Sequence, residues 1–281
     1  MRGQRITEIY DCEPTLTDRQ VMDFCKNGYL MLSAVVPDNV NRRVVEFLEA
    51  DPSGEPVAIM DEPWFVDAVI KNPLAAGAVR SLLGADFKLP GIVSNHRVHL
   101  PQPAGDWHPD SGSLITPRLD YLQVFYYPDG ATKEMGPTEI IPGSHFYKAR
   151  GGYLGRLRSV KSSMLTVAAP GSIFVTVYSI WHRRGVSTGT GVRNNLKYNY
   201  WRTSEPRRDW VVDPDFNFSW PRDADAPRFG VRAAEMFTWL CGEEWQFMGG
   251  QSWPCFTLSA LESDQEGLPE GLRRDRERVP G

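Results

Sequence analysis

The sequence predicts a mainly β protein with flanking helices, and three observations carry this prediction. From residue 87 onward, short apolar runs alternate with turn residues at the spacing of a β-sandwich or barrel rather than of βαβ units. Helical periodicity is confined to about 15–85 and to a short segment near 231–241. Hydrophobic residues make up 41% of the chain and aromatic residues 11%, which is enough for a sizeable core.

The helical N-terminal part is expected to contain three helices and one strand. Thr17 or Asp18 can cap the first helix and Asp38 the second, because short polar side chains accept hydrogen bonds from the free amides of a first turn. Gly28 and Gly84 end the first and third helices. The elements are predicted at 15–27, at 29–36 (the strand), from Asp38 to about Glu49, and at 64–83 with an interruption at Asn72-Pro73.

The predicted β region covers about residues 87–205 and is followed by an irregular and helical part over about 206–260. The last residues are polar and are expected to form a frayed tail. No repeat or linker is visible, so residues 1–281 are predicted to form a single domain. The β-strands are predicted at 92–100, 121–127, 138–141, 164–168, 172–181 and 195–202.

Composition and charge exclude several classes of function. The formal net charge of −4 gives no electrostatic footprint for nucleic acid. No run of 18 apolar residues exists, so no membrane-spanning helix is expected, and no signal peptide follows the basic start. A cytoplasmic location is therefore expected, with reduced thiols at four scattered cysteines: Cys12, Cys25, Cys241 and Cys255. The sequence carries no signal for an oligomeric state.

One His-X-Asp motif, His108-Pro109-Asp110, is the first candidate for metal binding. It lies between a loop rich in proline and glycine and the predicted strand 121–127. Side chains at i and i+2 of an extended backbone point to the same face, so His108 and Asp110 can converge on one ion. Such a motif arises easily by chance, and a third ligand must come from elsewhere.

His182 is the best candidate for the third ligand, with a satisfied core histidine as the alternative. It ends the apolar and β-branched run that starts at Ile173, and a strand end is where a scaffold presents a side chain to a site. Two histidines and one carboxylate form the set that binds non-heme Fe(II) and leaves other positions open. Eleven residues later, Arg193 can pair with a carboxylate, because a hairpin of 172–181 and 194–201 would bring it towards His182.

These residues resemble the phytanoyl-CoA dioxygenase family of Fe(II)- and 2-oxoglutarate-dependent oxygenases. That family shows a His-X-Asp, a Pro-Gly-Ser/Thr-His turn some thirty residues later, and a distal His followed by an Arg. The matching features here are His108 and Asp110, the segment 136–145, and His182 with Arg193. The opening segment Leu16 to Tyr29 is also similar, so the resemblance covers roughly residues 15–205.

The resemblance implies a double-stranded β-helix (jelly-roll, cupin-like) core with helices packed outside. It implies that His108, Asp110 and His182 hold Fe(II), that 2-oxoglutarate chelates the metal, and that Arg193 pairs with its far carboxylate. It also implies that the co-substrate pocket is lined near His96, Gln123 and Phe125. Family members often carry a small hydroxyl residue two positions after the distal histidine, where this chain has Arg184.

The reaction that this resemblance implies is the hydroxylation of an unactivated C–H bond in a small organic molecule. O2 is consumed and 2-oxoglutarate is decarboxylated to succinate. Desaturation, epoxidation and cyclisation use the same site and remain alternatives. Halogenating relatives replace the carboxylate ligand, so Asp110 disfavours that outcome.

The substrate is poorly defined by the sequence. Aromatic strand residues suggest an aromatic-lined barrel, although core packing explains at least half of them. Five arginines, if clustered near the site, indicate an anionic or carrier-linked substrate, with a solvated basic surface as the alternative. Two further classes stay open: a zinc hydrolase with the same ligands, and a non-catalytic jelly-roll binding module. The five arginines are Arg183, Arg184, Arg202, Arg207 and Arg208.

Overall fold

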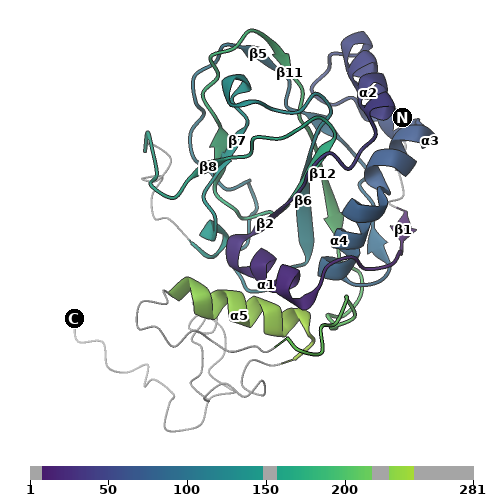
Figure 1. The fold of residues 1–281 in the computed structure, drawn as a ribbon, viewed down its shortest axis with the longest axis vertical. Helices are drawn as coiled ribbons and strands as arrows, with labels where there is room; N and C mark the ends of the chain where they lie inside the picture. Colours follow the sequence, from purple (N-terminus) through teal and green to yellow (C-terminus); the bar gives the residue numbers. More distant parts are fainter. Residues whose placement is uncertain (1–7, 148–156, 217–227, 244–281) are drawn as a thin grey trace.

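The computed structural model describes residues 8–147, 157–216 and 228–243 (Figure 1). The expected tail, Cys255 and the remainder of segment 206–260 lie outside these residues. In chain order the elements are β1 (Ile9–Tyr10), α1 (Asp18–Asn27), β2 (Tyr29–Leu32), α2 (Asp38–Ala50), a 3-10 turn (Val57–Asp61), α3 (Pro63–Phe65), a π-helical turn (Val66–Ile70), α4 (Pro73–Leu83), β3 (Phe87–Lys88), β4 (Ser94–Asn95), β5 (Val98–Leu100), β6 (Tyr121–Tyr127), a 3-10 turn (Lys133–Met135), β7 (Thr138–Ile140), a 3-10 turn (Ser144–Phe146), β8 (Met164–Leu165), β9 (Ser172–Val177), β10 (His182–Arg184), β11 (Gly191–Arg193), β12 (Leu196–Trp201) and α5 (Arg228–Leu240).

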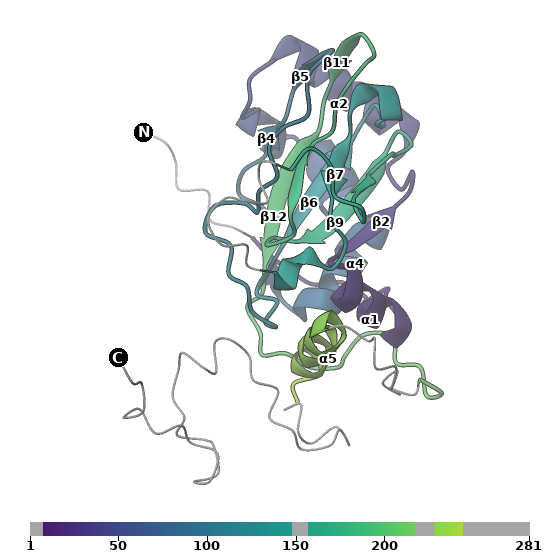
Figure 2. The ribbon, with the colours of Figure 1, turned by 90° about the vertical axis from the view of Figure 1, so that its left-hand side faces the viewer.

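The strands form one large antiparallel sheet and two small ones. The large sheet has seven strands in the order β1-β3-β12-β6-β9-β2, with β4 also pairing with β12. The small sheets are β10-β7-β8 and β11-β5, and both are antiparallel. Figure 2 shows β12, β6, β9 and β2 side by side, with β7 in front of them. No sheet closes into a barrel within the described residues.

Strand β6 contributes side chains to both faces of the large sheet, because successive side chains of a strand point in opposite directions. Leu122, Val124 and Tyr126 are buried in the main core, which also contains the inner faces of the helices. Phe125 and Tyr127 instead belong to a smaller cluster on the other face, between the large sheet and the sheet of β7. The side of the sheet that faces β7 and β10 therefore holds the predicted site.

The helices cover the opposite face of the large sheet. α2, α3 and α4 lie along one side of it (Figure 1), and α4 is buried along most of its length. α5 packs on α1, with Met236 and Phe237 joining Val21 and Phe24 in the main core. No helix among the described residues is long and apolar enough to cross a membrane.

The predicted helices are found close to their expected bounds, because their end signals are local. Thr17 caps α1 in a reciprocal arrangement with Gln20, and Gly28 ends the helix in the left-handed conformation. Asn72 caps α4 and Gly84 ends it. One cap was predicted wrongly: Asp38 is the first residue of α2, and Pro37 stands at the cap position without a side-chain hydrogen bond.

The predicted hairpin of 172–181 and 194–201 is wrong. β9 and β12 do not pair with each other, since β6 lies between them and pairs with both. Most predicted strands are also shorter than expected; the stretch 92–100 is divided into β4 and β5, and β9 ends at Val177. Arg193 is positioned instead by β11, which pairs with β5.

Candidate metal centre

The backbones of His108 and His182 pair directly, although 73 intervening residues separate them in the chain. His108 N donates to His182 O at 3.0 Å, and His182 N donates to His108 O at 2.9 Å. This antiparallel bridge continues β10 towards the loop that carries the His-X-Asp motif. The two rings therefore lie together, with centroids 4.6 Å apart.

Both imidazoles are oriented by backbone carbonyls. His108 Nδ1 lies 2.8 Å from Asp106 O, and His182 Nδ1 lies 3.0 Å from Ile180 O. A carbonyl only accepts hydrogen bonds, so in the neutral ring the proton is on Nδ1 and the Nε2 lone pair is free. This is the arrangement in which a histidine is held ready to ligate a metal.

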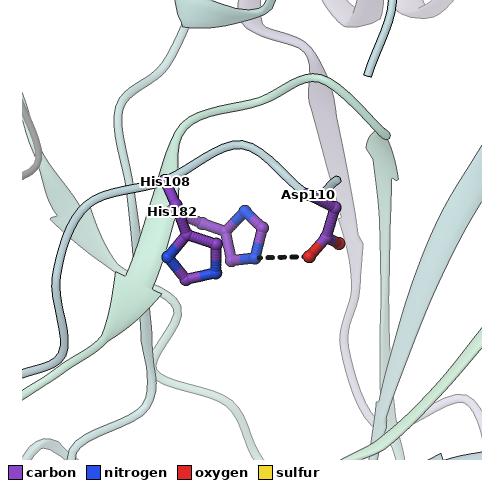
Figure 3. Close-up of side chains that lie close together, drawn as sticks. All are labelled: His108, Asp110 and His182. Carbon is purple, nitrogen blue, oxygen red and sulfur yellow. Dashed lines mark ion pairs between the residues drawn. The ribbon is translucent and has the colours of Figure 1, made fainter. Parts of the chain in front are cut away.

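Asp110 completes a three-residue cluster that could hold a metal ion (Figure 3). Ligand atoms of His108, Asp110 and His182 all lie within 4.8 Å of one another. Asp110 Oδ1 is 3.8 Å from His182 Nε2. The Asp110 carbonyl accepts a hydrogen bond from Ser113 Oγ at 2.6 Å, which fixes the turn that aims the carboxylate at the two rings.

The protonation states suit metal binding at neutral pH. Burial lowers the pKa of His182 to about 4, although Asp110 and the Ile180 carbonyl act in the opposite direction. The ring is therefore neutral at pH 7, which is the ligating form. Burial alone would raise the pKa of Asp110, but His182, Lys197 and Gln123 together hold it below its usual value, so the carboxylate is ionised.

Arg193 is buried with an unused donor. Its side chain is 2% exposed, and its Nη1 donates to Gly136 O. Its Nε is buried without a hydrogen-bond partner in the part of the chain that the structure describes. Burial lowers the pKa of Arg193, which means that the surroundings disfavour its charge. A carboxylate placed beside this guanidinium would satisfy both the charge and the free donor.

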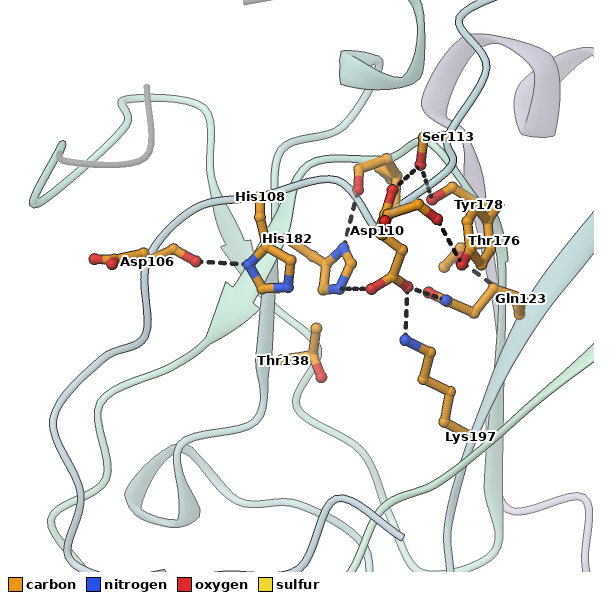
Figure 4. A network of polar contacts seen from close by, with 12 residues as sticks. Asp106, His108, Asp110, Ser113, Gln123, Thr138, Thr176, Tyr178, His182 and Lys197 are labelled. Carbon is orange, nitrogen blue, oxygen red and sulfur yellow. Dashed lines mark hydrogen bonds and ion pairs between the residues drawn. The ribbon is translucent and has the colours of Figure 1, made fainter. Parts of the chain in front are cut away.

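The three remaining predicted site residues lie around the same cluster. The ring of Phe125 is 6.2 Å from that of His182. Desolvation by the surrounding protein lowers the pKa of His96 to about 4; the charges of Lys197, His182 and Arg193 act in the same direction and that of Asp110 in the opposite one. Gln123 donates from Nε2 to Asp110 Oδ2, so its amide is directed at the carboxylate (Figure 4). The role of these three residues in co-substrate binding stays a prediction.

Four of the five arginines expected to form a basic cluster have separate partners in the structure. Arg183 pairs with Glu139 at 2.6 Å, while Arg184 donates to Pro103 O and turns its side chain to that loop. Arg208 pairs with Asp18 at the start of α1. Arg202 donates to Leu82 O and lies over the Trp239 ring. These partners lie on different elements, and an anionic or carrier-linked substrate stays a prediction.

Sequence reasoning missed Lys197, whose Nζ lies 2.6 Å from Asp110 Oδ2. The only signal was its position four residues after Arg193, between the apolar Leu196 and Tyr198. That alternation normally indicates a solvent-facing side chain. In this fold the second face of β12 is directed towards the candidate metal-binding residues, and the Lys197 side chain is 16% exposed.

Comparison with known proteins gives a likeness in fold only. No family model and no curated protein matches the sequence. HygX from Streptomyces hygroscopicus, solved with iron bound, aligns at a TM-score of 0.55 and 16% identity over 67% of this chain and 88% of HygX. EctD from S. alaskensis aligns at a TM-score of 0.55 and 18% identity, over 75% of this chain and 91% of EctD. SnoK, a non-heme alpha ketoglutarate dependent carbocyclase from nogalamycin biosynthesis, aligns at a TM-score of 0.52 and 16% identity. The alignment covers 71% of this chain and 91% of SnoK.

These likenesses confirm the predicted fold class: a mainly β, jelly-roll type of core with flanking helices. HygX has also been solved with nickel and 2-oxoglutarate, and with hygromycin B in addition.

Proposed function

We propose that this chain is a non-heme Fe(II)- and 2-oxoglutarate-dependent oxygenase that hydroxylates an unactivated C–H bond of a small organic molecule. The observation that carries the proposal is the joint presence of the His108, Asp110 and His182 cluster and the buried, incompletely paired Arg193. The first fits a divalent metal and the second fits a carboxylate. The motif order supports a distant place in the phytanoyl-CoA dioxygenase family.

Each residue has a separate task in this proposal. His108 and His182 offer Nε2 because their Nδ1 atoms are engaged by carbonyls. Asp110 offers Oδ1, since Oδ2 is already engaged. Two neutral rings and one carboxylate place a single negative charge on a divalent ion, which leaves it able to attract an anionic chelator. When bound, Fe(II) supplies the O2 chemistry that decarboxylates 2-oxoglutarate to succinate and CO2 and transfers the second oxygen atom to the substrate.

Arg193 and the apolar wall orient the co-substrate. The guanidinium would receive the far carboxylate of 2-oxoglutarate through its free Nε, in a site where burial removes competition from water. Phe125 and Phe174, in one buried cluster, exclude water from the interior face of the large sheet. The protein groups bind and orient, and none is required to move a proton.

An anaerobic titration tests the proposal. Apo-protein receives Fe(II), 2-oxoglutarate, or both, and the visible absorption is followed. A weak charge-transfer band that needs both additions, and that is lost in His182→Ala, is the expected result. His99→Ala is the matched control, because His99 is an exposed histidine on β5. Tight zinc retention with no band would favour a zinc hydrolase, and no metal binding at all would favour a binding module.

Once the chelate is established, succinate release identifies substrates from a screen of small molecules. Gain of one oxygen atom in the product supports hydroxylation. Loss of two hydrogen atoms would instead indicate desaturation or cyclisation at the same site.

A further inference from the structure

Two neighbouring strands direct polar side chains at one oxygen of Asp110. Lys197 on β12 places Nζ 2.6 Å from Asp110 Oδ2, and Gln123 on β6 donates to the same atom from Nε2 (Figure 4). The strands pair with each other, so the two side chains have a common rigid base. The other oxygen, Oδ1, is the one that faces His182.

The contacts are well shielded from water. The Lys197 side chain is 16% exposed and that of Asp110 is 15% exposed. Phe125 lies beneath the lysine, with the ammonium 5.9 Å from its ring centroid. Thr176 Oγ1 donates to the Gln123 carbonyl at 3.3 Å and ties β6 to β9 at this point. A charged hydrogen bond in such surroundings is stronger than one on the surface.

We propose that Lys197 and Gln123 are positioning residues that reserve Oδ2 of Asp110, so that the carboxylate meets the metal through Oδ1 alone. The inference rests on the proposed metal site. With Oδ2 free, a carboxylate can bind a metal through both oxygens and take a position that a chelating co-substrate needs.

Lys197 and Gln123 together could also bind a free carboxylate. If the Asp110 side chain is removed, an ammonium and an amide donor remain, both directed at the place that Oδ2 occupied. A small carboxylate such as formate would enter with one oxygen on these donors and the other towards the metal. The fit is chemical, because one charged and one neutral donor match a carboxylate oxygen.

Co(II) is the probe for the test, because it is stable in air and its d–d absorption reports both affinity and coordination number without any co-substrate. Lys197→Met keeps an unbranched side chain of similar length and removes the donor. Its Co(II) affinity is expected to fall about tenfold or more, as is typical when a partner of a metal ligand is lost. Its absorption should also change in intensity. Lys88→Met, at an exposed lysine of β3 in the same sheet, is the control and should match the parent protein.

A second arm keeps the test decisive if Lys197→Met folds poorly. In Asp110→Ala, formate is expected to strengthen Co(II) binding at least tenfold, and formamide is expected to have no effect. The gain should disappear when Gln123→Leu or Lys197→Met is added. Unchanged Co(II) affinity and absorption in Lys197→Met, or no effect of formate in Asp110→Ala, would overturn the proposal. Failure of the Fe(II) and 2-oxoglutarate band alone would reject the oxygenase assignment and leave this test standing.

Discussion

His108 and His182 exchange both of their backbone hydrogen bonds, at 3.0 and 2.9 Å. The pairing of two chain segments and the juxtaposition of two ligand side chains are therefore the same structural event. A metal held by both imidazoles would lock β10 to the loop that carries His108. Metal binding and the stability of this part of the fold should be thermodynamically linked.

The first prediction is that a divalent metal stabilises the protein. At a metal concentration of about 100 times Kd, linkage adds about 2.7 kcal/mol to the free energy of unfolding. His108→Ala and His182→Ala should abolish this gain, whereas His99→Ala should retain it. Thermal unfolding of apo-protein with and without Co(II) measures the effect. An equal gain in His182→Ala would show that the metal binds elsewhere.

The second prediction separates co-substrate binding from metal binding. Arg193→Ala should weaken 2-oxoglutarate binding about 100-fold, because a charged hydrogen bond in a buried site contributes about 1.5–3 kcal/mol. Metal affinity should change less than about twofold. Arg193→Lys keeps the charge without the planar fork and should give an intermediate loss. Titration of the chelate band measures both constants, and unaltered 2-oxoglutarate affinity in Arg193→Ala would remove this residue from the site.

The third prediction concerns Asp18, a fully buried carboxylate at the start of α1. It accepts hydrogen bonds from Arg208, Trp210 and the Asp213 amide. Burial alone would raise its pKa, but these donors outweigh burial and hold the pKa below its usual value. The stabilisation is therefore complete above the unfolded-state pKa of about 3.9 and is lost as pH falls through the lower folded-state value.

Asp18→Asn should accordingly cost about 2–4 kcal/mol at pH 7, because a buried partner of Arg208 is lost. The difference from the parent protein should shrink once the pH drops below about 4. Asp38→Asn is the control, since Asp38 also begins a helix but is exposed. Urea unfolding at several pH values gives the result, and a pH-independent difference would contradict the electrostatic explanation.

The fourth prediction concerns Gly28, which ends α1 at a φ of +77°. A Cβ at this position would lie 2.4 Å from Nδ1 of His145, a buried ring whose Nε2 contacts Cys25 O at 3.0 Å. Gly28→Ala combines left-handed strain with a steric clash and should cost more than about 2 kcal/mol. Gly54→Ala meets nothing within 4 Å and is the control. Equal unfolding midpoints for the two variants would disprove the proposed clash.

Local signals explain what the sequence could predict. The Thr17 cap, the Gly28 and Gly84 ends and the Asn72-Pro73 break lie within a few residues of the helices that they delimit. The strand at 121–127 was predicted with its observed bounds, because a run this rich in aromatic residues favours a strand.

Non-local pairing explains what the sequence could not predict. Strands β1, β3, β10 and β11 contain two or three residues each, too few to show a period, and they form only because a partner strand is in place. The position of β6 between β12 and β9 depends on contacts across the whole sheet. The hairpin of neighbouring strands that local sequence suggested was therefore wrong. The candidate ligands His108 and Asp110 could be proposed from the sequence because they share one short motif, whereas Lys197 belongs to no motif.

The alternation of side chains along β6 determines which substitutions affect the core and which affect the candidate site. Val124 is buried in the main core, whereas Gln123 and Phe125 lie on the face of the sheet that carries the candidate metal-binding residues. Substitutions at neighbouring positions of this strand are therefore expected to act differently, on folding at Val124 and on the candidate site at Gln123. A library restricted to Gln123 and Lys197 would vary the surroundings of Asp110 while leaving the main core intact. The two faces of one strand thereby separate the packing of the main core from the candidate site.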